Sequence, residues 1–446
     1  MADNVIRLPR PRSARSPADA LGLFVRVGRN DHKELLHIVA AGEKSIFGFV
    51  IDAHYATRHR DLIAEAKKRE FDLILDPRTQ PLALPGGYKS NLAELPWAGE
   101  GPHTLRDFDG EEGRQKAVAI VDYAIAHGFT QMLGPTHVLR GANDQWLRRD
   151  IEMMGRMSAA IRARKTDLDL IYSLAVPMEV LRNPAERGAL IHALADAPMD
   201  ALWLKVENFG DDASGEKTAA FIDAMRDFHQ LKVPIVADHV GGLPALAALA
   251  FGAVGGIAHG VTMNQGFSAS RWRRPPKEDG EEDADVTADE EGKKKKKGMA
   301  TWRVYLSTLD VLLKKADAEK FLSVSTRVRG KHSCKDTNCC PHGQKDMIER
   351  PARHAIYQRA REVDWLSKTP QGLRAAQFVD ERVRRVSDDV AAAAALAGLA
   401  EPVQKALAKK QVAMSRFRQV MAHLVTETRA DSVAISPPRR SVRRAS

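Results

Sequence analysis

The run Val233-Pro-Ile-Val-Ala-Asp238 is followed by the helix-like segment Leu243-Pro-Ala-Leu-Ala-Ala-Leu-Ala-Phe251 and then by Val254-Gly-Gly-Ile-Ala258. Short, continuous apolar runs are typical of strands that are buried on both faces of a parallel sheet. A segment of helical length between two such runs predicts a βαβ unit. The same alternation extends back along the chain to Ser45.

Five earlier runs share this strand-like character: Phe47–Asp52, Phe71–Asp76, Gln131–Pro135, Leu168–Val176 and Ala201–Glu207. Helical segments are predicted near 57–69, 112–127, 143–164, 178–196, 215–230 and 243–251. An eighth strand is expected at Trp302–Leu306, or at Phe321–Val324 if the first is helical. Eight such units close a TIM (β/α)8 barrel, so we predict an α/β fold with a TIM-like barrel over residues 45–325. The rival is a doubly wound open sheet, but Ile51-Asp-Ala-His54 stands where its glycine-rich turn would follow the first strand.

The chain of 446 residues carries a formal charge of +10. An excess of this kind favours contact with nucleic acid or another polyanion, with a basic surface kept for solubility as the plain alternative. Residues 1–20 and 429–446 are rich in arginine and are expected to be a disordered basic arm and tail. Residues 270–300 combine nine acids within 278–291 with five lysines at 293–297, which predicts a disordered charged insertion.

The region 330–428 is expected to be a zinc loop followed by a helical subdomain, with helices near 352–367, 370–396 and 401–426. Neither a secretory signal nor an apolar run long enough for a membrane span is seen. We therefore expect a cytoplasmic protein with no membrane partner. The sequence leaves open whether it acts as a homodimer or with a partner protein.

Polar residues occur repeatedly at the predicted C-terminal ends of the strands, where barrel enzymes hold their catalytic groups. Asp76, Asp238, Lys205 and Glu207 are the candidates for catalysis, since carboxylates can act as nucleophile or base. Lys205 and Glu207 share one face of an apolar strand and are expected to pair, either in catalysis or as a structural ion pair. The candidate substrate-binding residues at the other strand ends are Asp52, His54, Arg78, His137, Asn208, His239 and His259.

Two weaker patterns lie among the same residues. Asp52 and His54, completed by Asp238, His239 or His259, would suit a metal-dependent hydrolase. The glycines of Gly241-Gly242 and Gly255-Gly256 would let backbone N–H groups approach a phosphate.

All three cysteines lie in the run His332-Ser-Cys334-Lys-Asp-Thr-Asn-Cys339-Cys340-Pro-His342. Clustered thiolates with histidine are the ligand chemistry that Zn²⁺ prefers. We predict a structural zinc site formed by Cys334, Cys339, Cys340 and His354, with His342 and then His332 as substitutes for the histidine. The alternative is a set of reduced cysteines without metal.

A barrel followed by three clustered cysteines, a later histidine and a helical C-terminus resembles the tRNA-guanine transglycosylase superfamily, which includes relatives that insert 7-deazaguanines into DNA. The resemblance covers about 45–390 and implies zinc on the cysteine set and an early-strand aspartate that engages the base, matched by Asp76. The family's nucleophilic aspartate near the seventh strand has no counterpart in Gly255-Gly-Ile-Ala-His-Gly260, so the nucleophile is expected at Asp238.

We therefore expect a nucleic-acid base-modifying enzyme that exchanges a base of DNA or tRNA at its glycosidic bond. Two alternatives remain: a barrel hydrolase or lyase that acts on a small phosphorylated substrate, and a non-catalytic barrel protein that binds nucleic acid.

Overall fold

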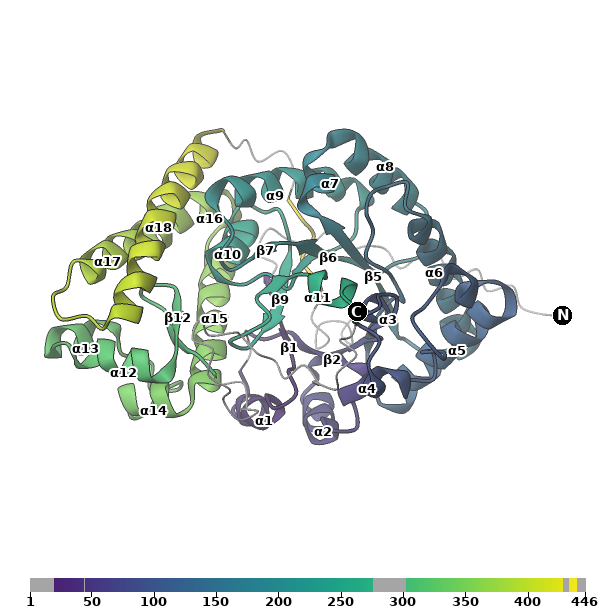
Figure 1. Ribbon diagram of the computed structural model, residues 1–446, viewed down its shortest axis with the longest axis horizontal. Helices are drawn as coiled ribbons and strands as arrows, with labels where there is room; N and C mark the ends of the chain where they lie inside the picture. Colours follow the sequence, from purple (N-terminus) through teal and green to yellow (C-terminus); the bar gives the residue numbers. More distant parts are fainter. Residues whose placement is uncertain (1–19, 44, 276–301, 428–432, 439–446) are drawn as a thin grey trace.

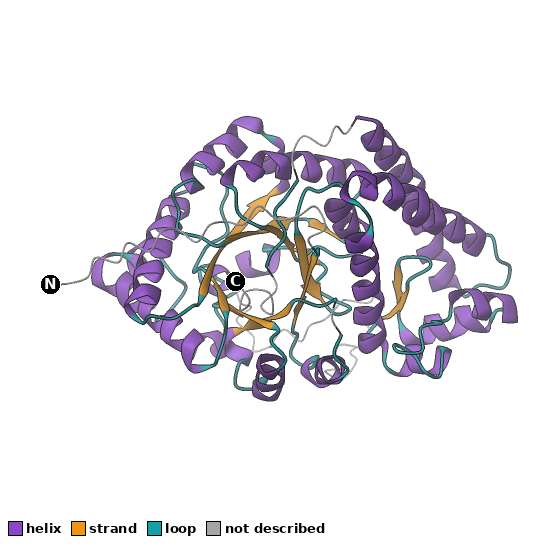
Figure 2. Cartoon of the chain, turned by 180° about the vertical axis from the view of Figure 1, so that it is seen from behind, coloured by secondary structure: helices purple, strands orange, loops and turns teal. Residues whose placement is uncertain are grey.

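The computed structural model describes residues 20–43, 45–275, 302–427 and 433–438. Its central element is a closed barrel of eight parallel strands surrounded by helices (Figures 1 and 2). The barrel strands are β1 (Gly22–Arg26), β2 (Gly48–Asp52), β3 (Asp72–Asp76), β4 (Gln131–Leu133), β5 (Asp169–Pro177), β6 (Ala201–Glu207), β8 (Ile235–Asp238) and β9 (Gly256–Gly260). β1 pairs with β9 and β5 pairs with β6, which closes the ring. The predicted TIM barrel is confirmed.

One strand differs from the sequence prediction. The eighth strand is β1, at the N-terminal end of the barrel, so the barrel begins at Gly22 and not at residue 45. Trp302–Leu306 was expected to be a barrel strand, but Val304–Leu306 (β11) forms a separate antiparallel hairpin with Val311–Leu313 (β12). Phe321–Val324, the other expectation, belongs largely to helix α12 (Lys315–Ser323).

The helices of the barrel are α1 (His32–Ala40), α2 (Arg60–Lys68), α3 (Thr79–Leu82), α4 (Ser90–Ala93), α5 (Gly110–Ala126), α6 (Gln145–Ala163), α7 (Met178–Arg182), α8 (Pro184–Leu194), α9 (Gly215–Phe228), α10 (Gly242–Ala250) and α11 (Ser270–Arg273). Each of the six predicted barrel segments contains a helix, and the structure adds α1, α3, α4 and α11, which were not predicted. The predicted helix 178–196 is two helices, because Asn183 caps α8 and Pro184 begins it. Two short strands, β7 (Phe209–Gly210) and β10 (Gly266–Phe267), extend the sheet beside β6.

The C-terminal helices form a subdomain on one side of the barrel (Figure 1). They are α13 (Thr326–His332), α14 (Gln344–Glu349), α15 (Pro351–Lys368), α16 (Gln371–Gln377), a π-helix at Phe378–Val383, α17 (Arg384–Ala394) and α18 (Glu401–Glu427). α15 packs against α1, α10 and β1, and α18 packs along α9. α16 and the π-helix also contact α10, so several helices of the subdomain join it to the barrel. None of the helices in the described ranges is long and apolar enough to cross a membrane.

The interior of the barrel is arranged in layers. A middle layer of apolar side chains from all eight strands fills it: Phe24, Val50, Ile74, Leu133, Ile171, Trp203, Val236 and Ala258. Because side chains alternate along a strand, the residues two positions later also face the interior, one layer nearer the C-terminal mouth. These include Arg26, Asp52, Asp76, Lys205 and Asp238, so the upper layer of this barrel is charged.

Of the segments expected to be disordered, some lie outside the described residues and others have a described structure. Residues 1–19 and 276–301 lie outside the described part of the chain, as do 439–446. Residues 270–275, by contrast, begin with the helix α11. Residues 433–438 of the expected tail pack against the N-terminal end of the barrel, where the Ala434 N–H donates to the Gly252 carbonyl at 3.0 Å. A side chain at Gly22 would collide with Pro437, and one at Gly255 with the backbone of Ile435.

We predict that deleting residues 433–446 lowers the free energy of unfolding by roughly 2–4 kcal/mol, because buried apolar contacts and a backbone hydrogen bond are lost. Chemical denaturation followed by circular dichroism measures the change. Deletion of 439–446 alone is the control and should leave the midpoint close to that of the full chain. Equal midpoints for both deletions would contradict a structural role for 433–438.

Candidate functional site

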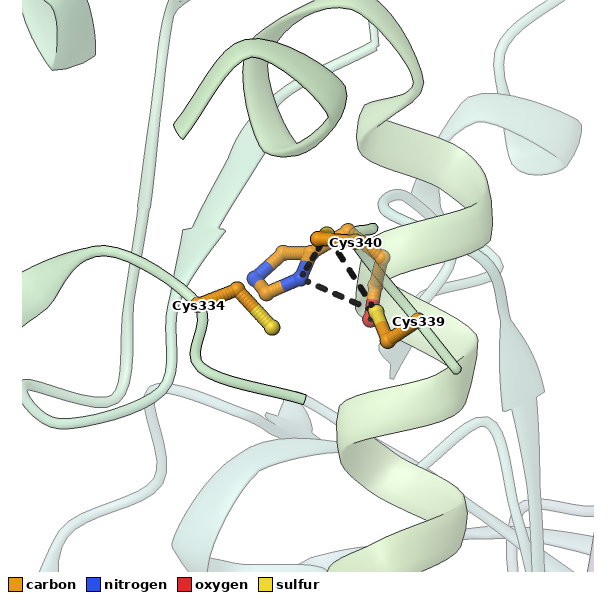
Figure 3. A group of neighbouring side chains, drawn as sticks. Cys334, Cys339 and Cys340 are labelled. Atoms are coloured by element: carbon orange, nitrogen blue, oxygen red, sulfur yellow. Dashed lines mark hydrogen bonds between the residues drawn. The ribbon is translucent and has the colours of Figure 1, made fainter. Parts of the chain in front are cut away.

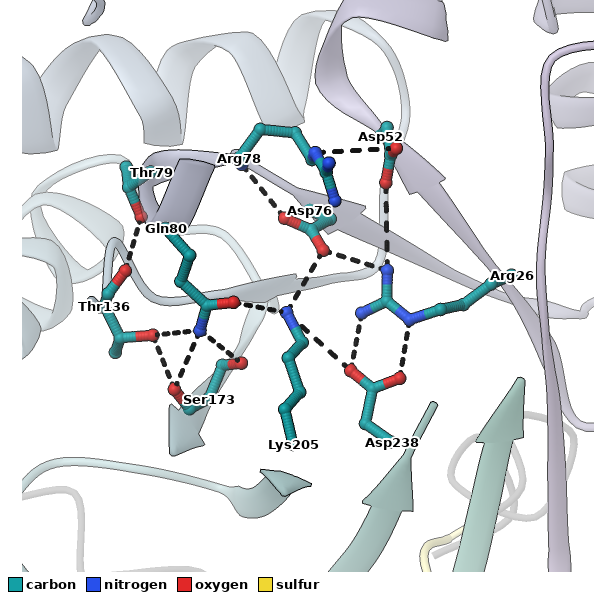
Figure 4. A network of polar contacts seen from close by, with 10 residues as sticks. All are labelled: Arg26, Asp52, Asp76, Arg78, Thr79, Gln80, Thr136, Ser173, Lys205 and Asp238. Carbon is teal, nitrogen blue, oxygen red and sulfur yellow. Dashed lines mark hydrogen bonds and ion pairs between the residues drawn. The ribbon is translucent and has the colours of Figure 1, made fainter. Parts of the chain in front are cut away.

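A network of charged side chains occupies the C-terminal mouth of the barrel (Figure 4). Arg26 of β1 is at its centre. Its Nε and Nη2 donate to the two carboxylate oxygens of Asp238, each at 2.5 Å, and its Nη1 donates to Asp76 Oδ2 at 2.9 Å. Bidentate pairing of this kind is the strongest form of charge-assisted hydrogen bond in proteins. It fixes the ends of β1, β3 and β8 relative to one another.

Lys205 reaches the same network from β6. Its Nζ donates to Gln80 Oε1 at 2.9 Å and lies 3.4 Å from Asp76 and 3.8 Å from Asp238. The Gln80 amide nitrogen in turn contacts Thr136 Oγ1 at 3.2 Å and Ser173 Oγ at 3.3 Å. Each polar group around the ammonium thus has a partner, as a buried charge requires.

The outer part of the network contains Asp52 and Arg78. Asp52 lies 3.7 Å from Arg26 and 3.6 Å from Arg78. The Arg78 N–H donates to Asp76 Oδ1 at 2.9 Å, and the Arg78 guanidinium stands over the ring of Trp272, 5.4 Å from its centroid. Three cations and three carboxylates therefore balance one another.

Burial and these partners set the protonation of the network. Burial alone would raise the pKa of Asp76, but Lys205 and Arg26 hold that pKa well below its usual value. Burial likewise opposes ionisation of Asp238, and Arg26 outweighs it, so the pKa of Asp238 is also lowered. Burial lowers the pKa of Lys205, and Asp76 offsets only part of the effect. The mouth therefore holds ionised carboxylates at neutral pH.

Glu207 is not part of this network, so the expected Lys205–Glu207 pair is wrong. Its carboxylate forms two hydrogen bonds with Arg273, at 2.9 and 2.7 Å, and accepts the Ala269 N–H at 3.0 Å. Both partners belong to the α11 segment, which follows β9. The Gly86 N–H donates to the Trp272 carbonyl at 2.7 Å. Glu207 therefore anchors α11 across the mouth, from β6 to the loop after β3.

Two of the predicted substrate-binding histidines lie outside the mouth. His137 follows β4 but points into the helical layer, where its Nδ1 lies 2.6 Å from Asp150 and its ring stacks on Trp146; burial lowers its pKa to about 3. His259 follows Ala258, an interior residue, and so faces outward; burial and Arg359 of α15 lower its pKa to about 4. Neither is placed to contact a substrate in the mouth.

The three remaining candidates are at the rim. His54 is half-buried just after β2, and burial lowers its pKa, with Asp52 opposing the change. His239 follows Asp238 with a φ of 60°, and burial and Arg26 lower its pKa to about 3. Asn208, with a φ of 57°, lines a shallow pocket of about 330 Å³ with Gly210 and Gly266.

Sequence reasoning missed Arg26, Gln80 and Arg273. Arg26 had a usable signal, because Leu21-Gly-Leu-Phe-Val-Arg-Val27 is an apolar run interrupted by one cation, as the Lys205 strand is. No local sequence pattern marked Gln80 or Arg273, because their partners come from distant strands.

A second group, remote from the mouth in the sequence, could hold a metal ion (Figure 3). The ligand atoms of Cys334, Cys339, Cys340 and His354 all lie within 4.8 Å of one another. The sulfur atoms of Cys339 and Cys340 are 3.5 Å apart and lie 3.4 and 3.5 Å from His354 Nδ1. For metal–sulfur bonds near 2.3 Å, a tetrahedron has edges of about 3.8 Å, so the four groups fit one ion.

A hydrogen bond outside the ligand set orients the histidine. His354 Nε2 lies 2.9 Å from the Tyr305 carbonyl of β11, which leaves Nδ1 free to face the thiols. The substitutes have other surroundings: His332 Nδ1 contacts Thr308 Oγ1 at 2.7 Å, and His342 is exposed. The four residues predicted from the sequence are thus brought together.

No family model and no curated protein matches the sequence. Solved structures do match the fold. A GH10 xylanase from Bispora sp. MEY-1 is 11% identical, with a TM-score of 0.35, over 53% of this chain and 82% of its own. A type I 3-dehydroquinate dehydratase from Clostridium difficile is also 11% identical, with a TM-score of 0.35, over 57% and 89%. An HpcH/HpaI aldolase from Desulfitobacterium hafniense is 10% identical, with a TM-score of 0.31, over 55% and 86%. These likenesses concern the barrel.

We predict that Arg26→Met destabilises the protein by about 3–5 kcal/mol at pH 7, because two buried carboxylates lose their partner. In the wild type, the lowered pKa values of Asp76 and Asp238 add stability above the unfolded carboxyl pKa, and this is lost as the pH falls. The stability deficit of Arg26→Met relative to the wild type should shrink as the pH falls, since protonation removes the unpaired charges. Denaturant unfolding between pH 4 and 8 tests this, and a deficit independent of pH would contradict it.

We also predict about one metal ion per chain, held by the cysteine cluster. Cys339→Ser should release the ion and lower the melting temperature, because the loop is fixed by its ligands. Elemental analysis of protein prepared without chelator gives the stoichiometry. His342→Gln is the matched control and should keep the metal; equal metal content in both variants would exclude this ligand set.

Proposed function

We propose that the chain is a nucleic-acid base-modifying enzyme that exchanges a base at its glycosidic bond, similar to the tRNA-guanine and 7-deazaguanine transglycosylases. The observation that carries the proposal is the combination, in one chain, of ionised carboxylates at a barrel mouth and a compact group of three cysteines and one histidine on the adjoining subdomain. This is the arrangement that the sequence resemblance implies.

The chemistry needs a carboxylate that can attack the sugar at C1′ or stabilise its cation as the base departs. The mouth supplies carboxylates that stay ionised at neutral pH, because Arg26 and Lys205 lie beside them. A base inside a duplex must first be flipped out of the stack to reach such a site.

The rim of the mouth suits a polyanion. Exposed arginines stand on the segments that follow β1, β2 and β9: Arg29, Arg58, Arg60, Arg271, Arg273 and Arg274. Arg58 is held in place by the Arg29 carbonyl, at 2.9 Å, and by Asn30 Oδ1, at 3.0 Å. Guanidinium groups are well suited to phosphate recognition, and these flank the charged layer where the reaction would occur.

For the cysteine cluster we propose zinc in a structural role. Three thiolates and one imidazole are a common closed tetrahedral set for Zn²⁺. With all four positions taken by protein, the ion has no place for substrate. It would supply stability to the irregular loop between α13 and α15, while the barrel residues perform the chemistry.

The lysine of the network favours a second candidate function, a lyase that acts on a small phosphorylated carbonyl compound. Lys205 is buried, its pKa is lowered by that burial, and Arg26 lies in the same network. A desolvated lysine near another cation is a group that forms Schiff bases. Borohydride reduction in the presence of a carbonyl substrate would leave a stable mass increase on Lys205.

We predict that the purified protein incorporates labelled guanine or 7-deazaguanine into tRNA or DNA. Scintillation counting of the precipitated polymer measures the exchange. Arg58→Glu should weaken polymer binding and reduce its salt dependence, because a phosphate contact is lost; Arg162→Glu, on α6, is the matched control. No incorporation into either polymer would refute the proposal and favour the lyase or the non-catalytic binding protein.

A further inference from the structure

The three carboxylates of the mouth differ in how far they are open to solvent. The Asp238 side chain is 0% exposed, that of Asp76 is 6% exposed and that of Asp52 is 21% exposed. All three face the interior from the C-terminal ends of their strands. Only Asp52 of the three therefore presents a reachable oxygen to a molecule that enters the mouth.

The two more buried carboxylates also accept more hydrogen bonds. Both oxygens of Asp238 are taken by Arg26, and both oxygens of Asp76 are taken by Arg26, Lys205 and the Arg78 N–H. The Asp52 carboxylate accepts no hydrogen bond from any residue in the described ranges. Its lone pairs are thus open, whereas an attack by Asp238 would first require its bidentate pair to break.

The cations beside Asp52 do not cover its carboxylate. Arg26 and Arg78 lie at 3.7 and 3.6 Å, too far for a hydrogen bond but close enough for electrostatic attraction. Arg78 is restrained by its position over Trp272, and Arg26 by Asp238. Figure 4 shows the Asp52 carboxylate at the edge of the network, beside both guanidinium groups.

We propose that Asp52 is the catalytic carboxylate of this site, and that Arg26, Asp76 and Asp238 are positioning residues. The assignment rests on the proposed base exchange. It replaces the expectation that Asp238 is the nucleophile.

The step balances as follows. An oxygen of Asp52 forms a bond to C1′ of the nucleotide as the bond from C1′ to the base nitrogen breaks. The electron pair of that bond leaves with the base, which takes a proton from water. The incoming base loses its ring N–H proton to water and attacks C1′, and the bond to Asp52 breaks to restore the carboxylate.

The first test compares two amide variants of equal volume. Asp52→Asn should lower the exchange rate on the order of 10³-fold or more while the protein stays folded and keeps its polymer affinity, since two ion pairs but no protein hydrogen bond are lost. Asp238→Asn is the matched variant and should mainly lower stability, because it breaks the pair with Arg26. Mass spectrometry of acid-quenched wild-type enzyme should find the nucleotide on the peptide that contains Asp52.

A second test labels the wild-type protein chemically and needs no activity assay. Carbodiimide with glycine ethyl ester modifies accessible carboxylates, so Asp52 of the intact protein should react at least about tenfold faster than Asp76 or Asp238, and a single-stranded oligonucleotide should protect it. Equal labelling of Asp52 and Asp238 would overturn the assignment.

The outcomes separate the two proposals. If the wild type exchanges bases and Asp52→Asn does so at the same rate, the role of Asp52 is wrong and the enzyme class stands. If the wild type exchanges no base into either polymer, the enzyme class fails and the role of Asp52 fails with it, whatever the labelling shows.

Discussion

The pairing of Arg26 with two buried aspartates is the interaction on which the rest of this mouth depends. In most TIM barrels the interior is filled by branched apolar side chains, and placing charges there carries a desolvation penalty of several kcal/mol for each ion. This chain offsets the penalty by pairing the buried charges: Arg26 contacts Asp238 and Asp76, and Lys205 adds a second cation. Because these residues come from four strands, the ionic layer also fixes the positions of those strands.

The same pairing explains why a list of acidic residues is a poor guide to reactivity here. Asp238 has the sequence context of a catalytic residue, at the end of an apolar strand and before a glycine pair. In the structure its side chain is buried and both of its carboxylate oxygens accept hydrogen bonds from Arg26, so its charge serves to hold Arg26. Asp52, flanked by cations at longer distances, keeps its access to solvent. Accessibility distinguishes the two residues, whereas residue type does not.

Much of the architecture could be predicted from local pattern, since strand and helix periods are properties of neighbouring residues. Seven barrel strands and most of the helices were placed within a few residues, and the cysteine cluster was found because thiolates are rare and were adjacent. The first strand was missed although its apolar run holds one cation, Arg26, as the predicted Lys205 strand does. The pairing of Glu207 with Arg273 could not be predicted from the sequence, because it depends on where α11 crosses the mouth. His137 and His259 were misplaced for a related reason: a strand end exposes one face to the mouth and the other to the helices, and a sequence position does not say which without the register.

The contacts beneath β1 bear on the order in which the protein can be completed during synthesis. β1 is among the first described elements to leave the ribosome, yet it is enclosed by β9 on one edge and by residues 433–438 below. β1 can pair with β2 early, but the strands form only an open, curved sheet until β9 reaches the other edge of β1. The underside of the ring stays uncovered until residues 433–438, which follow α18, have emerged. Such long-range closure is slow compared with local pairing. A nascent chain of this protein therefore exposes two unpaired strand edges for much of its translation, which makes that stage the one most in need of chaperone protection.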